Sequence, residues 1–230
     1  MLSPIVMAEL VIFDCDGVLV DSETISVGVL LEFVRRAGVE ISEDRAYRLF
    51  LGRSMAAVEE ALRSEFALTL SAVQLDGIRA ETFRRFRSEL KPMPGAAEAL
   101  ARLTARRCVA SSSSPERIRL SLSLTGLLEK LEPHIYSASM VTRGKPAPDL
   151  FLHAAKGMGV RPEDCVVVED SPAGIDAARR AGMRVFAFTG GSHAGHAALA
   201  AELGRLRPDL TFSDMRLLPD LVAEMGGRAA

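Results

Sequence analysis

The chain has 230 residues and is 48% hydrophobic, so it can form one sizeable domain or a core domain with a smaller one, and it is too apolar to be disordered. Its formal net charge is -2 and its charged residues are spread along the chain, which argues against a nucleic-acid partner. Its three cysteines form no C-x-x-C pair, which predicts reduced, buried thiols in a cytoplasmic protein and argues against a zinc site.

The first predicted element is a buried strand at Leu10–Phe13, a short apolar run. The apolar residues before it lack a basic leader, so we expect neither a signal peptide nor a membrane span. Asp14 follows the strand directly, and Asp16 stands two residues later. Carboxylates this close raise one another's pKa, which favours a divalent metal or a division into nucleophile and acid. An aspartate-rich turn without a function is the alternative.

From residue 21 to about residue 90 the pattern is helical and requires no strand. Four helices are predicted. Ser22 and Ser54 can cap the first and third, Ser42 with Glu43 and Asp44 opens the second, and Ser71 forms a capping box with Gln74 at the start of the fourth. We therefore predict two domains, an all-helical domain at residues 21–90 and an α/β core at residues 1–20 and 91–230.

After residue 92, strands alternate with helices. This alternation predicts a Rossmann-like parallel sheet with helices on both faces. The predicted strands are residues 107–110, 135–136, 165–168, 184–188 and 210–212; the predicted helices follow Pro94 and Pro115, cover residues 148–156 and 172–181, and begin at Met215.

Ligands of such a sheet bind beyond the carboxyl ends of its strands, so the polar residues just after strands are the candidates. Carboxylates from two strands suit Mg²⁺, while a hydroxyl, backbone N–H groups and a lysine suit an anion such as phosphate. Taken singly, these residues also fit a turn serine, a solvated lysine and an acidic pair at a helix N-terminus. Together they predict phosphoryl chemistry: Asp14, Asp16, Ser111, Lys145, Glu169 and Asp170.

These stretches resemble the four motifs of the haloacid dehalogenase superfamily, in the helical-cap phosphatase branch of phosphoglycolate phosphatases and β-phosphoglucomutase-like hydrolases. DCDGVLVDSE, VASSS, GKPAPD and VVVEDSPAGIDAARRAGM occur in the family's order, with the helical insert between the first two. The resemblance implies a Mg²⁺-dependent phosphoric monoester hydrolase that acts on a small phosphorylated metabolite, such as a sugar or sugar-acid phosphate. We expect a monomer or a weak dimer. Asp16 argues against a true dehalogenase, whose pattern lacks this second aspartate.

The resemblance also implies roles for the motif residues. Asp14 would attack phosphorus and form an aspartyl-phosphate, and Asp16 would protonate the leaving oxygen and then activate water. Mg²⁺ would be held by Asp14, the Asp16 carbonyl and Asp170, with Glu169 nearby or acting through water. Lys145 would offset the charge of Asp14 and the phosphate.

The remaining predicted contacts concern the substrate. Ser111 and the Ser112 N–H would bind phosphoryl oxygens. In the helical insert, Arg53 is the candidate for contacting the substrate, although an exposed salt-bridging arginine is an equal alternative. Ser26 and Met55 stand near the positions where the resembling mutases have a histidine and an arginine, so hydrolysis is favoured over a phosphomutase. A non-catalytic phosphate-binding regulator is a third possibility.

Two other patterns are interpreted without a function. The serine run beside His134 or His153 lacks a G-x-S-x-G elbow, so it predicts a turn rather than a serine hydrolase. His193 and His196 lie in a glycine-rich stretch without acidic neighbours in the sequence, which predicts a surface loop rather than a metal pair.

Overall fold

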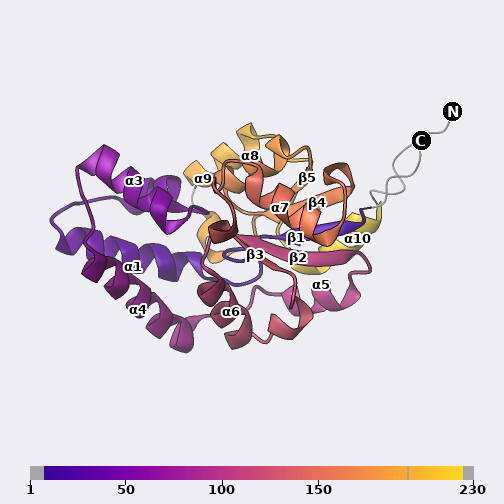
Figure 1. Ribbon diagram of the computed structural model, residues 1–230, viewed down its shortest axis with the longest axis horizontal. Helices are drawn as coiled ribbons and strands as arrows, with labels where there is room; N and C mark the ends of the chain where they lie inside the picture. The colour runs from indigo at the N-terminus through magenta and orange to yellow at the C-terminus, as the bar shows by residue number, and fades with distance from the viewer. Residues whose placement is uncertain (1–7, 196, 225–230) are drawn as a thin grey trace.

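The computed structural model describes residues 8–195 and 197–224. Within these residues the strands form a six-stranded parallel sheet in the order β3-β2-β1-β4-β5-β6 (Figure 1). The prediction of a parallel α/β sheet is therefore confirmed. The strands are β1 (Leu10–Phe13), β2 (Arg106–Ser111), β3 (Ile135–Ser137), β4 (Cys165–Glu169), β5 (Arg184–Phe188) and β6 (Leu210–Phe212).

Strand β1 lies in the middle of the sheet, between β2 and β4. Its last residue, Phe13, is in register with Val109 of β2 and with Val168 of β4. The next residue keeps this register, because the Asp14 N–H donates to the Val168 carbonyl at 3.0 Å. The chain moves outward from β1 to β2 and β3 and then returns to β4 on the other side, so the ends of the three central strands meet where such sheets bind ligands.

Helices cover both faces of the sheet. Val11 and Phe13 belong to one core with α5, α6 and α10, while Leu10 and Ile12 belong to the other core with α7, α8 and α9, as the alternation of side chains along a strand requires. No helix of the described residues has the length and apolar character needed to span a membrane. These helices are α5 (Ala96–Arg102), α6 (Pro115–Leu124), α7 (Asp149–Met158), α8 (Pro172–Arg180), α9 (Ala197–Arg205) and α10 (Leu218–Glu224).

Short 3₁₀ helices complete the described part of the α/β region. The helix predicted to begin at Met215 starts as one of them, η5, and continues as α10. The 3₁₀ helices are η1 (Leu128–Lys130), η2 (Ala138–Met140), η3 (Pro162–Asp164), η4 (Ser192–Gly195) and η5 (Met215–Leu217).

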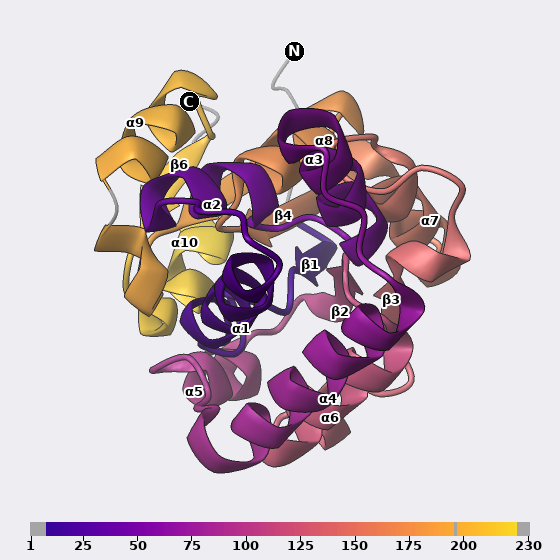
Figure 2. The same ribbon diagram turned by 90° about the vertical axis from the view of Figure 1, so that its left-hand side faces the viewer.

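Between β1 and α5 the chain forms a helical segment beyond one end of the sheet (Figures 1 and 2). Its two connections to the sheet region lie side by side: the Asp21 N–H donates to the Lys91 carbonyl at 3.0 Å, and the Met93 N–H donates to the Leu19 carbonyl at 2.9 Å. The chain therefore leaves and re-enters the sheet region at one place. The four predicted helices are present as α1 (Glu23–Arg36), α2 (Glu43–Phe50), α3 (Met55–Phe66) and α4 (Ala72–Glu89).

The predicted serine caps are only partly present. Ser54 caps α3, and Ser71 forms the predicted capping box with Gln74 at the start of α4. Ser22 precedes α1 but makes no side-chain cap hydrogen bond, so that cap prediction is wrong, whereas α2 begins directly after Ser42 as predicted. The backbone of Ser22 is αR (φ -101, ψ -17) rather than extended as at an N-cap, and its hydroxyl donates to Asp16 Oδ1 at 2.6 Å.

Candidate active site

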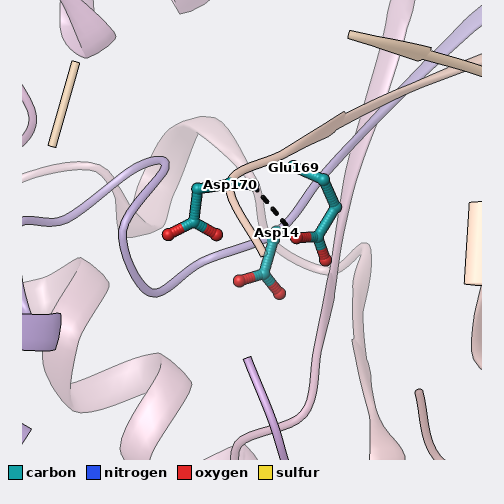
Figure 3. A group of neighbouring side chains, drawn as sticks. All are labelled: Asp14, Glu169 and Asp170. Atoms are coloured by element: carbon teal, nitrogen blue, oxygen red, sulfur yellow. Dashed lines mark hydrogen bonds between the residues drawn. The ribbon is translucent and has the colours of Figure 1, made fainter. Parts of the chain in front are cut away.

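A buried acidic cluster lies where β1 and β4 end. Asp14, Glu169 and Asp170 each offer a carboxylate oxygen, and these oxygens lie within 4.8 Å of one another (Figure 3). Burial raises the pKa of Asp14 well above its ordinary value; Lys145 opposes this shift and Glu169 adds to it. Burial, followed by the charge of Glu169, likewise raises the pKa of Asp170. The cluster thus concentrates more negative charge than Lys145 alone can balance.

Asp170 is the member of the cluster whose carboxylate lacks donors. Both its oxygens are buried, and neither accepts a hydrogen bond from the described residues. His193 Nε2 lies 2.8 Å from Oδ2, but without the geometry of a hydrogen bond. On the other side, a Cβ at Gly17 would lie 1.9 Å from Oδ2, so only glycine allows the backbone this close. A buried carboxylate without donors is unfavourable unless a cation binds it, and carboxylate oxygens are the ligands that Mg²⁺ prefers, so the residues fit a divalent cation.

Lys145 is the fixed cation of this site. Its fully buried Nζ donates to Asp14 Oδ1 at 2.7 Å and also to Glu169 Oε1. Burial alone lowers the pKa of Lys145, but the charges of Asp14 and Glu169 raise it above its ordinary value, so the ammonium is charged. The second oxygen of Glu169 accepts from the N–H groups of Asp170 and Ser171 and from the Ser171 hydroxyl, at 2.9 to 3.1 Å. Glu169 is therefore fully partnered, in contrast to Asp170.

Asp16 does not join the acidic cluster, because its carboxylate points to a different set of partners. Oδ1 accepts from the Ser22 hydroxyl at 2.6 Å and from Arg117 Nη2 at 2.7 Å, and Oδ2 accepts from the Ser113 hydroxyl at 2.6 Å. Burial alone raises the pKa of Asp16, but Arg117 and the two hydroxyls bring it below its ordinary value. The pKa values of Asp14 and Asp16 are therefore shifted in opposite directions in the protein without metal or substrate, because the two carboxyl groups lie in different environments.

The serines after β2 contact the helical segment as well as the sheet. The buried Ser111 hydroxyl accepts from the Ser113 N–H at 3.1 Å, and the Ser112 hydroxyl donates to the Gly52 carbonyl at 2.8 Å. Gly52 lies in the turn between α2 and α3 with φ +68, and a Cβ there would lie 2.2 Å from Ser171 Oγ. This turn therefore lies directly on the ends of β2 and β4, and the Ser112 side chain holds it.

A cavity of about 320 Å³ separates this edge of the sheet from the helical segment. The predicted residues Asp14, Asp16, Ser111, Ser112 and Arg53 all line it, whereas Lys145, Glu169 and Asp170 are not among its lining residues. The exposed Arg53 makes no ion pair with a described residue. The helical side of the cavity is mixed. Its apolar side chains include Val27, Leu30, Met55, Val58, Leu75 and Ile78, and its polar ones are Glu23, Ser26, Arg53, Asp76, Arg79 and Thr82.

The comparison with known families agrees with this geometry. The model of the haloacid dehalogenase-like hydrolases matches residues 8–182, which include both aspartates, Lys145 and the acidic pair after β4. The chain belongs to the haloacid dehalogenase-like hydrolases. The resemblance inferred from the four motifs is thus confirmed.

Named relatives of this haloacid dehalogenase-like hydrolase include phosphatases. The 6-phosphogluconate phosphatase of Escherichia coli (strain K12) is 34% identical over 186 residues, which cover 80% of this chain and 84% of that protein. A solved haloacid dehalogenase-like protein of unknown function from Agrobacterium tumefaciens C58 has a TM-score of 0.80 and 42% identity, covering 94% of this chain and 98% of that one. A hydrolase from Deinococcus radiodurans R1, solved with bound phosphate and sodium, has a TM-score of 0.73 and 31% identity, covering 96% and 97%. The prediction of a phosphoric monoester hydrolase is confirmed.

The surface loop predicted around His193 is only partly right for this member of the family: Ser192 and Gly195 are exposed, but His193 is buried. His193 is 1% exposed and lies against Asp170, and burial lowers the pKa of its imidazole. The loop folds inward because the Ser192 hydroxyl donates to Asp21 Oδ1 at 2.8 Å, at the start of the helical segment. The glycines in the sequence predict a turn, but they do not indicate the distant residues against which the turn packs. His196 lies outside the described residues.

Three further residues of this hydrolase's site were not predicted. Glu23 is buried and lines the cavity, and burial, followed by the charge of Asp16, raises its pKa to about 8. Ser113 and Arg117 hold the Asp16 carboxylate. An acidic residue in the first turn of a helix is ordinary, so Glu23 gave no signal. Arg117 did give a signal in the sequence, because a cation in the first turn of α6 opposes the helix dipole and is therefore expected to have an anionic partner nearby.

Proposed function

We propose that this hydrolase is a Mg²⁺-dependent phosphatase that acts on a small phosphorylated sugar or sugar acid through an aspartyl-phosphate. The observation that carries the proposal is the position of Asp14, which lines the cavity while Lys145 holds its Oδ1. Oδ2 accepts no hydrogen bond from the described residues and is therefore the atom available to attack phosphorus. The printed name of the 6-phosphogluconate phosphatase supports the substrate class.

The donor-free carboxylate of Asp170 supports the choice of a divalent cation. Asp14, Asp170 and the Asp16 carbonyl would hold Mg²⁺, with Glu169 beside them. When bound, the ion supplies positive charge that favours the ionised form of Asp14 and balances the phosphoryl oxygens. Lys145 adds a second positive charge, fixed by the protein, on the opposite oxygen of Asp14 from the attacking one.

In the first step, Oδ2 of Asp14 forms a bond to phosphorus, the bond from phosphorus to the ester oxygen breaks, and Asp16 gives its proton to that oxygen. In the second step, Asp16 takes a proton from water, the water oxygen attacks phosphorus, and inorganic phosphate and the Asp14 carboxylate separate. Arg117 lowers the pKa of Asp16 in the absence of substrate. The anionic phosphate of an incoming substrate shifts that pKa upward, so Asp16 gains its proton as substrate binds.

Hydrolysis is favoured over return of the phosphoryl group to the substrate. Ser26 lines the cavity at the position where the resembling mutases have a histidine, and its hydroxyl is engaged: it donates to the Ser22 carbonyl at 2.8 Å and accepts from Arg117 at 2.9 Å. A serine in this arrangement offers no group that titrates near neutral pH. The site therefore has no second acid or base at this position to guide the phosphoryl group back.

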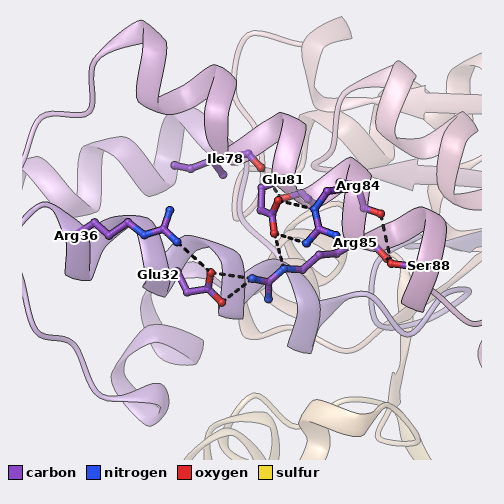
Figure 4. Close-up of polar contacts among 8 residues, drawn as sticks. Glu32, Arg36, Ile78, Glu81, Arg84, Arg85 and Ser88 are labelled. Carbon is purple, nitrogen blue, oxygen red and sulfur yellow. Dashed lines mark hydrogen bonds and ion pairs between the residues drawn. The ribbon is translucent and has the colours of Figure 1, made fainter.

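We also propose that residues 21–90 act as a cap domain over an α/β core of residues 1–20 and 91–230. The Ser112–Gly52 hydrogen bond and the paired connections support this division. Within the segment, Arg85 of α4 donates to both oxygens of Glu32 of α1 at 2.6 and 2.7 Å (Figure 4), which favours movement of α1 and α4 as one unit. Such a cap excludes water while the covalent intermediate exists.

The test is the release of inorganic phosphate from a panel of sugar, polyol and sugar-acid phosphates, including 6-phosphogluconate, with and without EDTA. We expect release that needs Mg²⁺ and is abolished by Asp14→Asn, which keeps the side-chain volume. Release from none of the esters, or release unaffected by EDTA or by Asp14→Asn, would contradict the proposal. An isomerised sugar phosphate formed faster than free phosphate would identify a mutase.

A further inference from the structure

Arg117 occupies a position that its own helix disfavours. It lies in the first turn of α6, where the helix dipole repels a cation, yet its side chain is only 20% exposed. The guanidinium carbon lies over the buried Phe86 ring, 5.1 Å from the ring centre, which restricts its movement. The fold thus places a largely buried, charged group in the cavity wall.

The hydrogen bonds of Arg117 leave part of its donor capacity unused. Nη2 donates to Asp16 Oδ1 at 2.7 Å and to Ser26 Oγ at 2.9 Å. Nε is buried and has no partner among the described residues. Nη1 likewise makes no side-chain hydrogen bond within the described part of the chain. A guanidinium has five N–H donors in a fixed plane; Nε is enclosed, so Nη1 is the nitrogen that can serve an acceptor entering the cavity.

The position of Asp16 shows which substrate atom can reach those donors. In the proposed function the ester oxygen must approach the Asp16 carboxylate to receive its proton. Arg117 already contacts that carboxylate, so an acceptor on the carbon next to the ester carbon enters the space beside the guanidinium. An acceptor further along the substrate lies toward the helical side of the cavity, where apolar side chains alternate with polar ones such as Arg53 and Arg79, and no longer beside Arg117.

We propose that Arg117 determines specificity by donating a hydrogen bond to an oxygen on the carbon adjacent to the phosphoester carbon. The preferred substrates are then phosphate monoesters of vicinal diols, such as terminal phosphates of polyols, sugars and sugar acids, and simple alkyl phosphates are poor substrates. This inference rests on the proposed function and goes beyond it, because it assigns the choice of leaving group to one residue of the α/β region rather than to the helical segment.

The test compares three esters that differ by one hydroxyl: propane-1,2-diol 1-phosphate, propane-1,3-diol 1-phosphate and n-propyl phosphate. For the wild type we expect kcat/KM to be about 10- to 100-fold higher for the 1,2-diol ester than for the other two, the range of a hydrogen bond to a charged group. Arg117→Met keeps the packing on Phe86 but removes the donors. The kcat/KM values for the three esters should then lie within about 3-fold of one another, because the hydrogen bond that distinguishes the esters is lost. The esters also differ in intrinsic reactivity. This difference cancels when the kcat/KM ratio of two esters is compared between the wild type and a variant.

Two further variants keep the test decisive. Arg117→Lys keeps a positive charge on a shorter side chain without the planar fork, so its ammonium cannot take the places of both Nη2, at Asp16, and Nη1. The preference should therefore fall in this variant too, which keeps the test usable if the methionine variant does not fold. Arg119→Met is the matched control, since Arg119 is on the same helix, 46% exposed and paired with Glu132, and it should keep the wild-type preference.

Equal losses on all three esters in Arg117→Met and Arg117→Lys would overturn the inference, because they would mean that Arg117 only positions Asp16. A wild type that prefers n-propyl phosphate or the 1,3-diol ester would also overturn it. Absence of hydrolysis of any ester, p-nitrophenyl phosphate included, would be a different result: it would overturn the proposed function, and the inference with it.

Discussion

Replacing Asp170 by asparagine should stabilise the metal-free protein while removing its response to Mg²⁺. The wild-type carboxylate is 1% exposed, has no hydrogen-bond donor among the described residues and lies beside Glu169 and Asp14. Leaving a buried polar group unsatisfied is unfavourable by about 1 to 3 kcal/mol, and more when the group is charged. The neutral amide removes the charge and offers an N–H₂ group to the neighbouring carboxylates. For a chain of this size the gain corresponds to a rise in Tm of about 2 to 12 °C.

The assay is thermal unfolding of Asp170→Asn and wild type in EDTA and in excess Mg²⁺. A ligand at about 100 times its Kd stabilises the folded state by about 2.7 kcal/mol, so the wild-type Tm should rise with Mg²⁺ and that of the variant should not. Asp176→Asn is the matched control on α8, because Asp176 is 32% exposed and paired with Arg180. A variant less stable than wild type in EDTA, or one that keeps the Mg²⁺ response, would refute the reasoning.

Three further predictions concern single residues. Asp16→Asn should lower kcat about 10² to 10⁴-fold on alkyl phosphates and much less on p-nitrophenyl phosphate, whose leaving group needs little protonation; equal losses at a rate-limiting chemical step would exclude Asp16 as the acid. Glu23 has its pKa raised by burial from 4.5 to about 8, so its contribution to stability is complete below 4.5 and is lost as the pH rises through about 8. Glu23→Gln should therefore gain stability relative to wild type across that window in chemical denaturation, and a constant difference would contradict this. Ser112→Ala removes the hydrogen bond to the Gly52 carbonyl and should raise KM about 2- to 10-fold with little change in kcat; an unchanged KM would show that this contact does not affect substrate binding.

Local patterns were sufficient to predict most of the fold. The apolar runs at β1 and β4 mark strands that are buried along their whole length, and the capping box at Ser71 and Gln74 marks the start of α4. These signals depend only on residues that are close to one another in sequence, so they can be recognised without knowledge of the fold. The cap predicted at Ser22 is absent because the folded chain holds its backbone in the αR region and turns its hydroxyl toward Asp16.

The candidate site was only partly predictable for the same reason. Asp14 and Asp170 follow apolar strands, and strand ends meet at a known edge of a parallel sheet. His193 and Arg117 contact the site from a distant loop and a distant helix, and no local pattern states which carboxylate each will meet. The separation of Asp14 and Asp16 into two environments also depends on such partners, Lys145 for one and Arg117 for the other.

The most direct test of the account is detection of the covalent intermediate. Wild-type protein mixed with a phosphate ester and Mg²⁺ should be quenched with acid within the first turnover and examined by mass spectrometry of its peptides. The account predicts one phosphoryl group on the peptide that contains Asp14, formed before phosphate is released and absent in Asp14→Asn. Hydrolysis that proceeds with no phosphorylated peptide at any quench time, or a phosphoryl group on another residue, would contradict it.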